Sequence, residues 1–247
     1  MRSMRRTISL HRSSSSKLLF GLLLALLSPL SQAGDSFPSF LAEYTVSRNG
    51  TEIGIRTHSV SRTQHNYLYE GSMHTTGLAS LIKPGTITER SHWTIEQQRV
   101  VPQKYEYLDS SDEKRNSFLQ FDWLTNTVTN HVGNKPWKMS IPIGTQDKFG
   151  YMLSLMQDLQ RGQTRPEYKI ADGGRLKTYR FKSLGSELIE TPAGQFKALK
   201  LRSTRVGKKN IFTYVWCLPE KKYLPVKIQR HKKDNVYTML LSHVTGL

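Results

Sequence analysis

The sequence predicts a mainly β fold, a strongly curved antiparallel sheet in the form of an open β-barrel or β-roll with one packed helix. Three observations support this prediction. The last third of the chain, residues 185–244, contains apolar and aromatic runs separated by turn residues such as Pro192-Ala193-Gly194. Earlier runs alternate between apolar and polar residues with a period of two. Only one segment, residues 147–161, has helical spacing.

The first 33 residues have the three parts of a secretory signal peptide. Five basic residues come first, namely Arg2, Arg5, Arg6, Arg12 and Lys17. A short apolar run follows at residues 18–27, and small residues then predict cleavage between Ala33 and Gly34. A membrane span needs roughly 20 apolar residues, more than this run offers. We therefore expect a signal peptide over 1–33, one mature domain over 34–247 with no transmembrane span, and a periplasmic location.

The mature chain is strongly basic and has one cysteine. Removal of the five basic residues of the signal leaves 31 Lys and Arg against 19 Asp and Glu, a net charge of +12. Such a charge favours anionic partners such as lipid headgroups or cell-wall polymers, although it also simply promotes solubility. Because Cys217 is the only cysteine, no internal disulfide is expected and the hydrophobic core must hold the fold together.

The N-terminal half reads as a series of strands. Residues 40–47 and 53–60 flank Asn49-Gly50, the dipeptide best suited to a two-residue hairpin turn. Residues 67–74 alternate strictly, which implies one buried and one wet face. Further strands are expected near residues 87–95, 102–107, 119–123 and 128–132. Residues 76–85 are apolar for a loop and are expected to tuck onto the core rather than form a lid.

The helix is expected over residues 147–161. Its apolar positions are Phe149, Met152, Leu153, Met156 and Leu159. Asp147 is the expected N-terminal cap and Gly162 the expected stop. The apolar stripe must cover part of the sheet, on a face or at the mouth of the barrel.

The remaining strands form a closing meander. Asp172-Gly173-Gly174 predicts a hairpin turn, and the strand after it alternates through Tyr179 and Phe181. Strands then follow at residues 186–196, 212–217, 223–228 and 236–243.

This meander resembles an exported bacterial family, the domain of unknown function 3108 (DUF3108). The resemblance rests on residues 189–196, Ile-Glu-Thr-Pro-Ala-Gly-Gln-Phe, on the following Leu199-Lys200-Leu201 strand, and on Trp216 with the segment 223–228. The 44–54 hairpin, Pro102 and the helix occur in the expected order, so the resemblance extends over about residues 40–244. It implies a curved antiparallel sheet or β-roll, similar in outline to periplasmic carriers of lipoproteins and lipids, and it implies no activity.

No catalytic or cofactor motif is present. The chain lacks a nucleophile elbow, a phosphate-binding glycine loop, and the HExxH and CxxC patterns, so we expect no enzyme activity, no cofactor and no metal. The mature histidines are scattered and are not at metal-ligand spacing. Basic residues interleaved with aromatics would suit single-stranded nucleic acid, but the export signal argues against that partner.

The expected function is therefore non-catalytic binding of an apolar or anionic amphiphilic, lipid-like ligand at the concave face, in maintenance of the cell envelope. The inward aromatic candidates for this site are Trp93, Tyr105, Tyr107, Phe121, Trp123 and Trp216. The main alternative is a scaffold with a filled core that binds an envelope protein. Less favoured alternatives are a cell-wall hydrolase with two carboxylates and an outer-membrane β-barrel.

Overall fold

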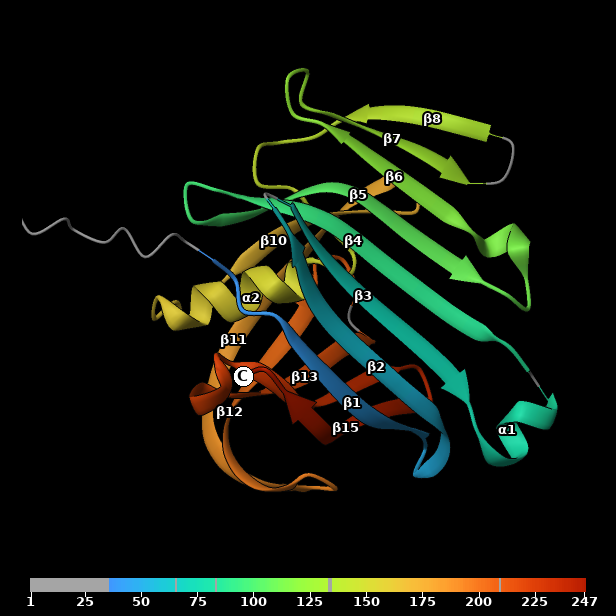
Figure 1. Ribbon diagram of the computed structural model, residues 1–247, viewed down its shortest axis with the longest axis vertical. Helices are drawn as coiled ribbons and strands as arrows, with labels where there is room; N and C mark the ends of the chain where they lie inside the picture. Colours follow the sequence, from blue (N-terminus) through green and yellow to red (C-terminus); the bar gives the residue numbers. More distant parts are fainter. Residues whose placement is uncertain (1–35, 65, 83, 133–134, 209) are drawn as a thin grey trace, which may run out of the picture. The chain divides into compact units, whose positions relative to one another are not determined.

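Fifteen strands form one sheet in the part of the chain that the computed structural model describes, residues 36–64, 66–82, 84–132, 135–208 and 210–247 (Figure 1). The strands are β1 (Phe40–Arg48), β2 (Thr51–Thr63), β3 (Asn66–Thr75), β4 (Thr86–Glu96), β5 (Arg99–Asp109), β6 (Ser117–Asp122), β7 (Thr127–Val132), β8 (Lys135–Ser140), β9 (Gln146–Asp147), β10 (Glu167–Asp172), β11 (Arg175–Thr191), β12 (Gly194–Arg205), β13 (Ile211–Leu218), β14 (Leu224–Lys232) and β15 (Asn235–Thr245). All neighbouring strands are antiparallel except β9 and β10. The predicted fold class is confirmed.

The strand order consists of two meanders that meet at one seam. The order is β8-β7-β6-β5-β4-β3-β2-β1-β15-β14-β13-β12-β11-β10-β9, so the first and last strands pair near its middle. Asn49 fastens one end of this seam, because its backbone N–H donates to Val236 O and its side-chain oxygen accepts from Val236 N, each at 2.8 Å. Asn49 and Gly50 have φ values of 50° and 85°, as the predicted hairpin turn requires.

Helix α2 (Tyr151–Gln160) packs against the inward face of both meanders (Figure 1). Leu153 and Met156 join the core cluster that contains Tyr67 and Trp93 of the first meander. Leu155 and Leu159, from the other side of the helix, join a second cluster built mainly from β10–β13. Because buried residues lie on both sides of α2, the helix fills the space between the two halves of the sheet.

The predicted helix begins later than residue 147, and Asp147 is not its cap. The helix starts at Tyr151, after Gly150, and has no side-chain cap. Asp147 instead ends strand β9, with its carboxylate bonded to the backbone of residues 149 and 150. The predicted stop is confirmed, because Gly162 has φ 78° and donates to Leu159 O at 3.0 Å while Gln163 N donates to Asp158 O at 2.9 Å. These two bonds form a Schellman motif.

The stretch expected to tuck onto the core contains a short helix instead, α1 (Gly77–Ile82). Leu81 of this helix is 79% exposed, so the expectation of burial is wrong for that side chain.

The Asp172-Gly173-Gly174 turn is confirmed, with φ values of 56° and 75° at its glycines. Cys217 is fully buried, and burial raises the pKa of its thiol. No helix in the described ranges is both long and apolar enough to cross a membrane. The predicted signal peptide lies outside the described residues.

Candidate functional site

The pairing register places the inward-facing side chains in rows across the sheet. One row runs through Tyr44, Arg56, Met73, Ile87 and Asp109, on β1 to β5. The next row runs through Ala42, His58, Gly71, Glu89 and Tyr107. Both rows share the parity of the buried core, so Arg56 and Glu89 are charged residues on the inward face.

The segment 147–150 lies across this inward face, between β9 and α2. Phe149 inserts its ring among the side chains of β2 and β3, where it stacks on Tyr69 at 4.0 Å and meets His58 edge-on at 5.3 Å. Gly71 makes the room. A Cβ at that position would lie 2.7 Å from Phe149 Cζ, so a side chain there would displace the ring. We call residues 147–150 the plug segment.

Asp147 anchors the plug segment. Its Oδ1 accepts from Phe149 N at 2.7 Å and Gly150 N at 2.6 Å, and its Oδ2 accepts from Ser91 Oγ at 2.6 Å. Burial raises the pKa of this carboxyl, and these hydrogen bonds only partly counter the effect. Gly150 has no room for a side chain, because a Cβ would lie 2.6 Å from Ser91 Oγ.

We expect Asp147→Ala to lower the free energy of unfolding by about 2–4 kcal/mol, since three buried hydrogen bonds are lost. Asp147→Asn should stay within about 1 kcal/mol of the native protein at pH 7, because an amide accepts the same backbone bonds without a buried charge. A carboxyl with a raised pKa stabilises most at acidic pH and loses that contribution as pH rises through its folded pKa. Chemical denaturation at a series of pH values above about 3.9, the ordinary value for an aspartate side chain, should therefore favour Asp147→Asn increasingly as the pH rises. An Asn variant as unstable as the Ala variant would show that the charge itself is required.

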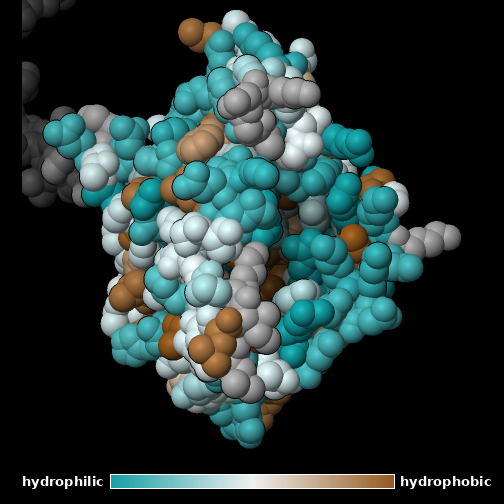
Figure 2. Space-filling view, turned by 90° about the vertical axis from the view of Figure 1, so that its right-hand side faces the viewer, coloured by the Kyte–Doolittle hydropathy of each residue, from teal (hydrophilic) through white to brown (hydrophobic). Residues whose placement is uncertain are grey.

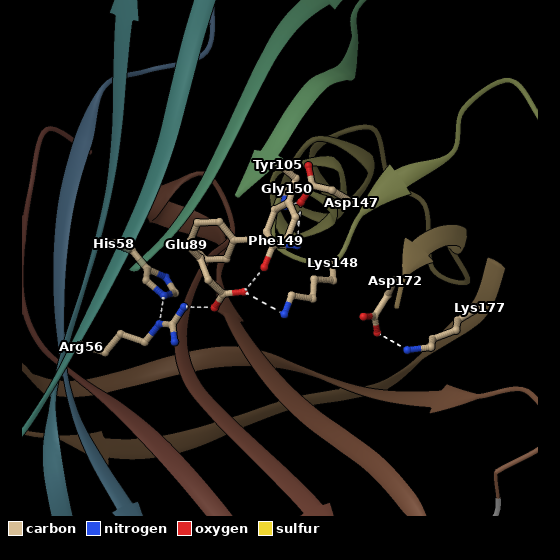
Figure 3. A network of polar contacts seen from close by, with 10 residues as sticks. All are labelled: Arg56, His58, Glu89, Tyr105, Asp147, Lys148, Phe149, Gly150, Asp172 and Lys177. Atoms are coloured by element: carbon tan, nitrogen blue, oxygen red, sulfur yellow. Dashed lines mark hydrogen bonds and ion pairs between the residues drawn. The ribbon is translucent and has the colours of Figure 1, made fainter. Parts of the chain in front are cut away.

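Glu89 is the centre of an ion cluster beside the plug segment (Figure 3). Its Oε2 lies 2.6 Å from Arg56 Nη2, and its Oε1 accepts from Tyr105 OH at 2.7 Å. Lys148 Nζ, from the plug segment, lies 3.8 Å from Glu89 Oε1. Burial alone would raise the pKa of Glu89, but the charges of Arg56 and Lys148 and two hydrogen bonds outweigh burial and lower it. Glu89 is therefore ionised, and Arg56, Glu89 and Lys148 form what we call the interior charge cluster.

The geometry also fixes the protonation of His58. Arg56 Nε, which can only donate, lies 2.7 Å from His58 Nε2, so that nitrogen must accept. The ring proton therefore resides on Nδ1 and is donated to Tyr69 OH at 2.9 Å. Burial and the neighbouring Arg56 charge lower the pKa of His58 well below its ordinary value, in agreement with a neutral ring. Arg56 is thus held between a neutral imidazole and a carboxylate.

Lys148 is the member of the cluster with spare hydrogen-bonding capacity. Its ammonium group lies 4.1 Å from the centre of the Tyr107 ring and 5.4 Å from that of Tyr105. Aromatic faces attract a cation without accepting all three of its N–H donors. With its side chain 30% exposed and its carboxylate partner at 3.8 Å, Lys148 can bind a second anionic group.

Positive charge exceeds negative charge on this part of the inward face. Asp172 and Lys177, on β10 and β11, form an ion pair near the cluster (Figure 3). Arg230 has the inward parity of Ile228 and forms no ion pair within the described residues, although it acts on the pKa values of Tyr151 and Tyr179. The four cations Arg56, Lys148, Lys177 and Arg230 thus share this face with three carboxyl groups, those of Glu89, Asp172 and Asp147, so cations outnumber carboxyl groups by one.

Burial along the inward face decreases away from α2. Near the helix, Trp93, Leu153 and Leu201 are fully buried. Met73 and Met239 have the same inward parity but are only half-buried. Figure 2, which views the molecule from the right-hand side of Figure 1, shows a hollow with a hydrophilic rim and brown, hydrophobic atoms inside it. The inward face therefore combines a tightly packed core under α2 with an open hollow that has both polar and apolar walls.

The structure brings together some of the six aromatic candidates. Tyr105 and Tyr107 border the interior charge cluster. Trp93 is inward but fully buried, stacked on Tyr67 at 4.2 Å. Phe121 is buried next to half-buried Trp123, whose indole N–H donates to Pro102 O at 2.8 Å.

Trp216 departs from the inward arrangement expected of it. Val215 and Cys217, its neighbours on β13, pack in the cluster under α2. Trp216 points to the opposite face of β13, where it is buried at 3% exposure in the main core cluster and its indole N–H donates to Glu187 Oε1 at 2.6 Å. Alternation along a strand explains the difference, because a residue between two neighbours that face α2 must lie on the other side of the sheet.

Arg56, Glu89 and Lys148 are not among the site residues predicted from the sequence. Arg56 lies between Gly54 and His58, and Glu89 between Ile87 and Ser91, on the parity of buried residues. A charged residue on the buried face of a predicted strand could therefore have marked Arg56 and Glu89 as site residues. Among the described residues, no three His, Cys, Asp or Glu side chains are grouped closely enough to hold a metal ion.

Comparison with known proteins places the chain in a structural context. The family described as "Protein of unknown function (DUF3108)" matches residues 43–242. The β-barrel-like protein of the domain of unknown function DUF1849 from Brucella abortus superposes with a TM-score of 0.58 at 8% identity, over 84% of this chain and 97% of that one. That likeness shows the fold alone.

Two further solved structures are more distant. A protein described as a candidate lipoprotein from Parabacteroides distasonis has a TM-score of 0.35 at 11% identity, over 85% of this chain and 96% of that one. A candidate exported protein with a YmcC-like fold from Bacteroides fragilis has a TM-score of 0.34 at 10% identity, over 83% and 95%. Among curated proteins, none matches the chain.

Proposed function

Since the chain belongs to the DUF3108 family, to which no activity is attached, we propose its function from the site itself: non-catalytic binding of an amphipathic ligand with an anionic head group, in the bacterial cell envelope. The signal-peptide pattern of residues 1–33 supports export to the periplasm. The proposed binding site is the inward face of the sheet around the interior charge cluster.

One observation carries the proposal, namely the excess of cations on a half-open, otherwise apolar inward face. Lys148 shares the Glu89 carboxylate with Arg56, and Arg230 forms no ion pair among the described residues. Lys148 also borders the rings of Tyr105 and Tyr107, and Arg230 acts on the pKa of Tyr179. Ligand sites typically pair apolar walls with a few placed polar groups. A head group carrying a carboxylate or phosphate would complete the charge balance, while its acyl or other apolar portion would contact residues such as Met73 and Met239.

The partly buried inward residues Met73 and Met239 favour this function over a scaffold with a filled core. In a filled interior, residues with the parity of the core would be buried along the whole strand. Here β3 runs from Tyr67 at 4% exposure to a half-buried Met73 on the same face. A binding role requires no pair of catalytic residues. The polar groups of the cluster, Glu89 and the neighbouring His58, hold Arg56 and Lys148 in place.

The primary experiment is native mass spectrometry of the mature protein purified from periplasm without detergent. A stoichiometric bound amphiphile, identified after extraction, would support the proposal. An apo mass that does not shift on addition of a long-chain fatty acid or of lysophosphatidylglycerol would overturn it and direct attention to protein partners.

Lys148→Met is expected to weaken binding of a long-chain fatty acid at least tenfold, because it removes the available cation and retains an apolar side chain against Tyr107. Displacement of a fluorescent fatty acid measures the effect. Affinity for a neutral monoglyceride should change less than about twofold, because its uncharged head group forms no ion pair with Lys148. Lys148→Arg should retain binding, and Lys114→Met, at an exposed position, serves as the control. Equal loss for the fatty acid and the monoglyceride would contradict a role in head-group recognition.

A further inference from the structure

A second feature lies on the outward face of the sheet, away from the hollow. Strands β12, β13 and β14 turn Leu201, Val215 and Cys217 inward under α2. Alternation therefore places Lys200, Arg202, Tyr214 and Trp216 on the other face. We call the set Lys200, Arg202, Lys227, Phe212, Tyr214 and Trp216 the basic aromatic patch.

Cations and rings alternate across the patch because of the strand register. Lys200, Trp216 and Lys227 occupy one cross-strand row, and Arg202 pairs with Tyr214 in the next. Lys200 Nζ lies 5.0 Å from the centre of the Trp216 ring, and Lys227 Nζ lies 4.6 Å from it. Arg202 lies over Phe212 at 4.9 Å. These contacts orient the basic side chains while leaving their charges in place.

Most of this charge is not neutralised within the protein. Lys200 lies 3.2 Å from Glu187, which also accepts from Trp216. Arg202 and Lys227 form no ion pair with any carboxylate of the described residues, and Arg202 is exposed. The patch therefore has a net positive charge, and its basic groups lie over aromatic rings. Most protein surfaces instead intersperse lysines with acidic residues.

The patch continues into a concave surface at the end of β12. Arg202, Arg205 and Lys208 line a depression of about 520 Å³ together with Thr204 and Gly207. Val206, between these basic residues, is 49% exposed. A depression lined by three cations matches an anionic group.

We propose that the basic aromatic patch and this depression form a docking surface for an anionic lipid bilayer. Lys and Arg near an anionic membrane surface each add to the attraction, while Trp216, which is buried, holds Lys200 and Lys227 over its ring. The basic aromatic patch lies on the opposite face of the sheet from the hollow, so a membrane docked on the patch would leave the hollow open. This inference does not depend on the proposed ligand binding, since no residue is shared by the two sites.

The test is co-sedimentation of the mature protein with vesicles of phosphatidylcholine alone or with phosphatidylglycerol added. The variant Arg202→Gln/Lys208→Gln/Lys227→Gln removes three charges from the surface. The control Arg99→Gln/Lys114→Gln/Lys138→Gln removes three exposed charges from the first meander. Both variants should retain the native thermal midpoint, which shows that they fold.

The expected result is binding that requires phosphatidylglycerol, weakens with salt, and falls at least tenfold in the patch variant but less than about threefold in the control. Equal loss in both variants would overturn the proposal in favour of general charge attraction. Absence of vesicle binding would also overturn it. Retention on a soluble acidic polysaccharide that is lost only in the patch variant, without vesicle binding, would assign the surface to a polyanion instead.

Discussion

Phe149→Ala is expected to lower the free energy of unfolding by about 3–5 kcal/mol, the range found for large aromatic truncations in cores. The ring is buried and stacked on Tyr69, so its removal leaves a cavity over Gly71. Urea denaturation followed by tryptophan fluorescence measures the effect. The reason is geometric: the plug segment has no other large apolar side chain that could fill the space.

A double-mutant cycle separates this contact from general core damage. Gly71→Ala should cost about 1–3 kcal/mol alone, because its Cβ would lie 2.7 Å from the Phe149 ring. In the Phe149→Ala background, most of that cost should disappear, since the cavity receives the methyl group. Phe121→Ala, another buried phenylalanine, provides the matched partner and should show no coupling with Gly71→Ala. Additive effects of Gly71→Ala and Phe149→Ala would contradict the placement of the ring.

Glu89→Gln is expected to destabilise the protein by about 3–5 kcal/mol, because Arg56 and Lys148 would then remain buried or half-buried without their common carboxylate. The effect should also depend on pH. Since the folded pKa of Glu89 is lowered, its contribution is present above the unfolded value, about 4.3 for glutamate, and is lost as pH falls through the folded pKa. The difference in stability between native protein and variant should therefore shrink as the pH falls below that unfolded value.

A double variant provides the control for this experiment. Glu89→Gln combined with Arg56→Met removes the ion pair as a unit, and it should be less destabilised than Glu89→Gln alone. Stability is measured by chemical denaturation at each pH. A Glu89→Gln variant with native stability at pH 7, or a difference that is constant with pH, would show that Glu89 does not hold the two cations.

Local features of the chain were predictable because their causes are local. The Asn49-Gly50 and Gly173-Gly174 turns follow from the backbone angles that these residues adopt readily. The inward positions of Tyr105, Tyr107 and Phe121 follow from alternation within one strand. The helix was predicted by spacing, and its end at Gly162 by the same reasoning.

The site was less predictable because its parts are far apart in sequence. Arg56, Glu89 and Lys148 come from three segments that only the register and the path of the chain from β8 to β9 bring together. The same path explains the error at Asp147. As a sequence it looks like a helix cap, but its carboxylate is needed four residues before the helix to hold the plug segment against Ser91.

The seam between β1 and β15 has a consequence for how the protein is made. Each meander can assemble by successive hairpins, in which contacts are close in sequence and form quickly. The seam joins residues 41–48 to residues 237–245, so β1 has no partner on that side until nearly the whole chain is available. We therefore expect closure of the seam to be the slow step of folding, and a chain that is still incomplete to expose an unpaired strand edge. Such a chain would contain paired hairpins but would lack the β1–β15 ladder until its C-terminal strand is available.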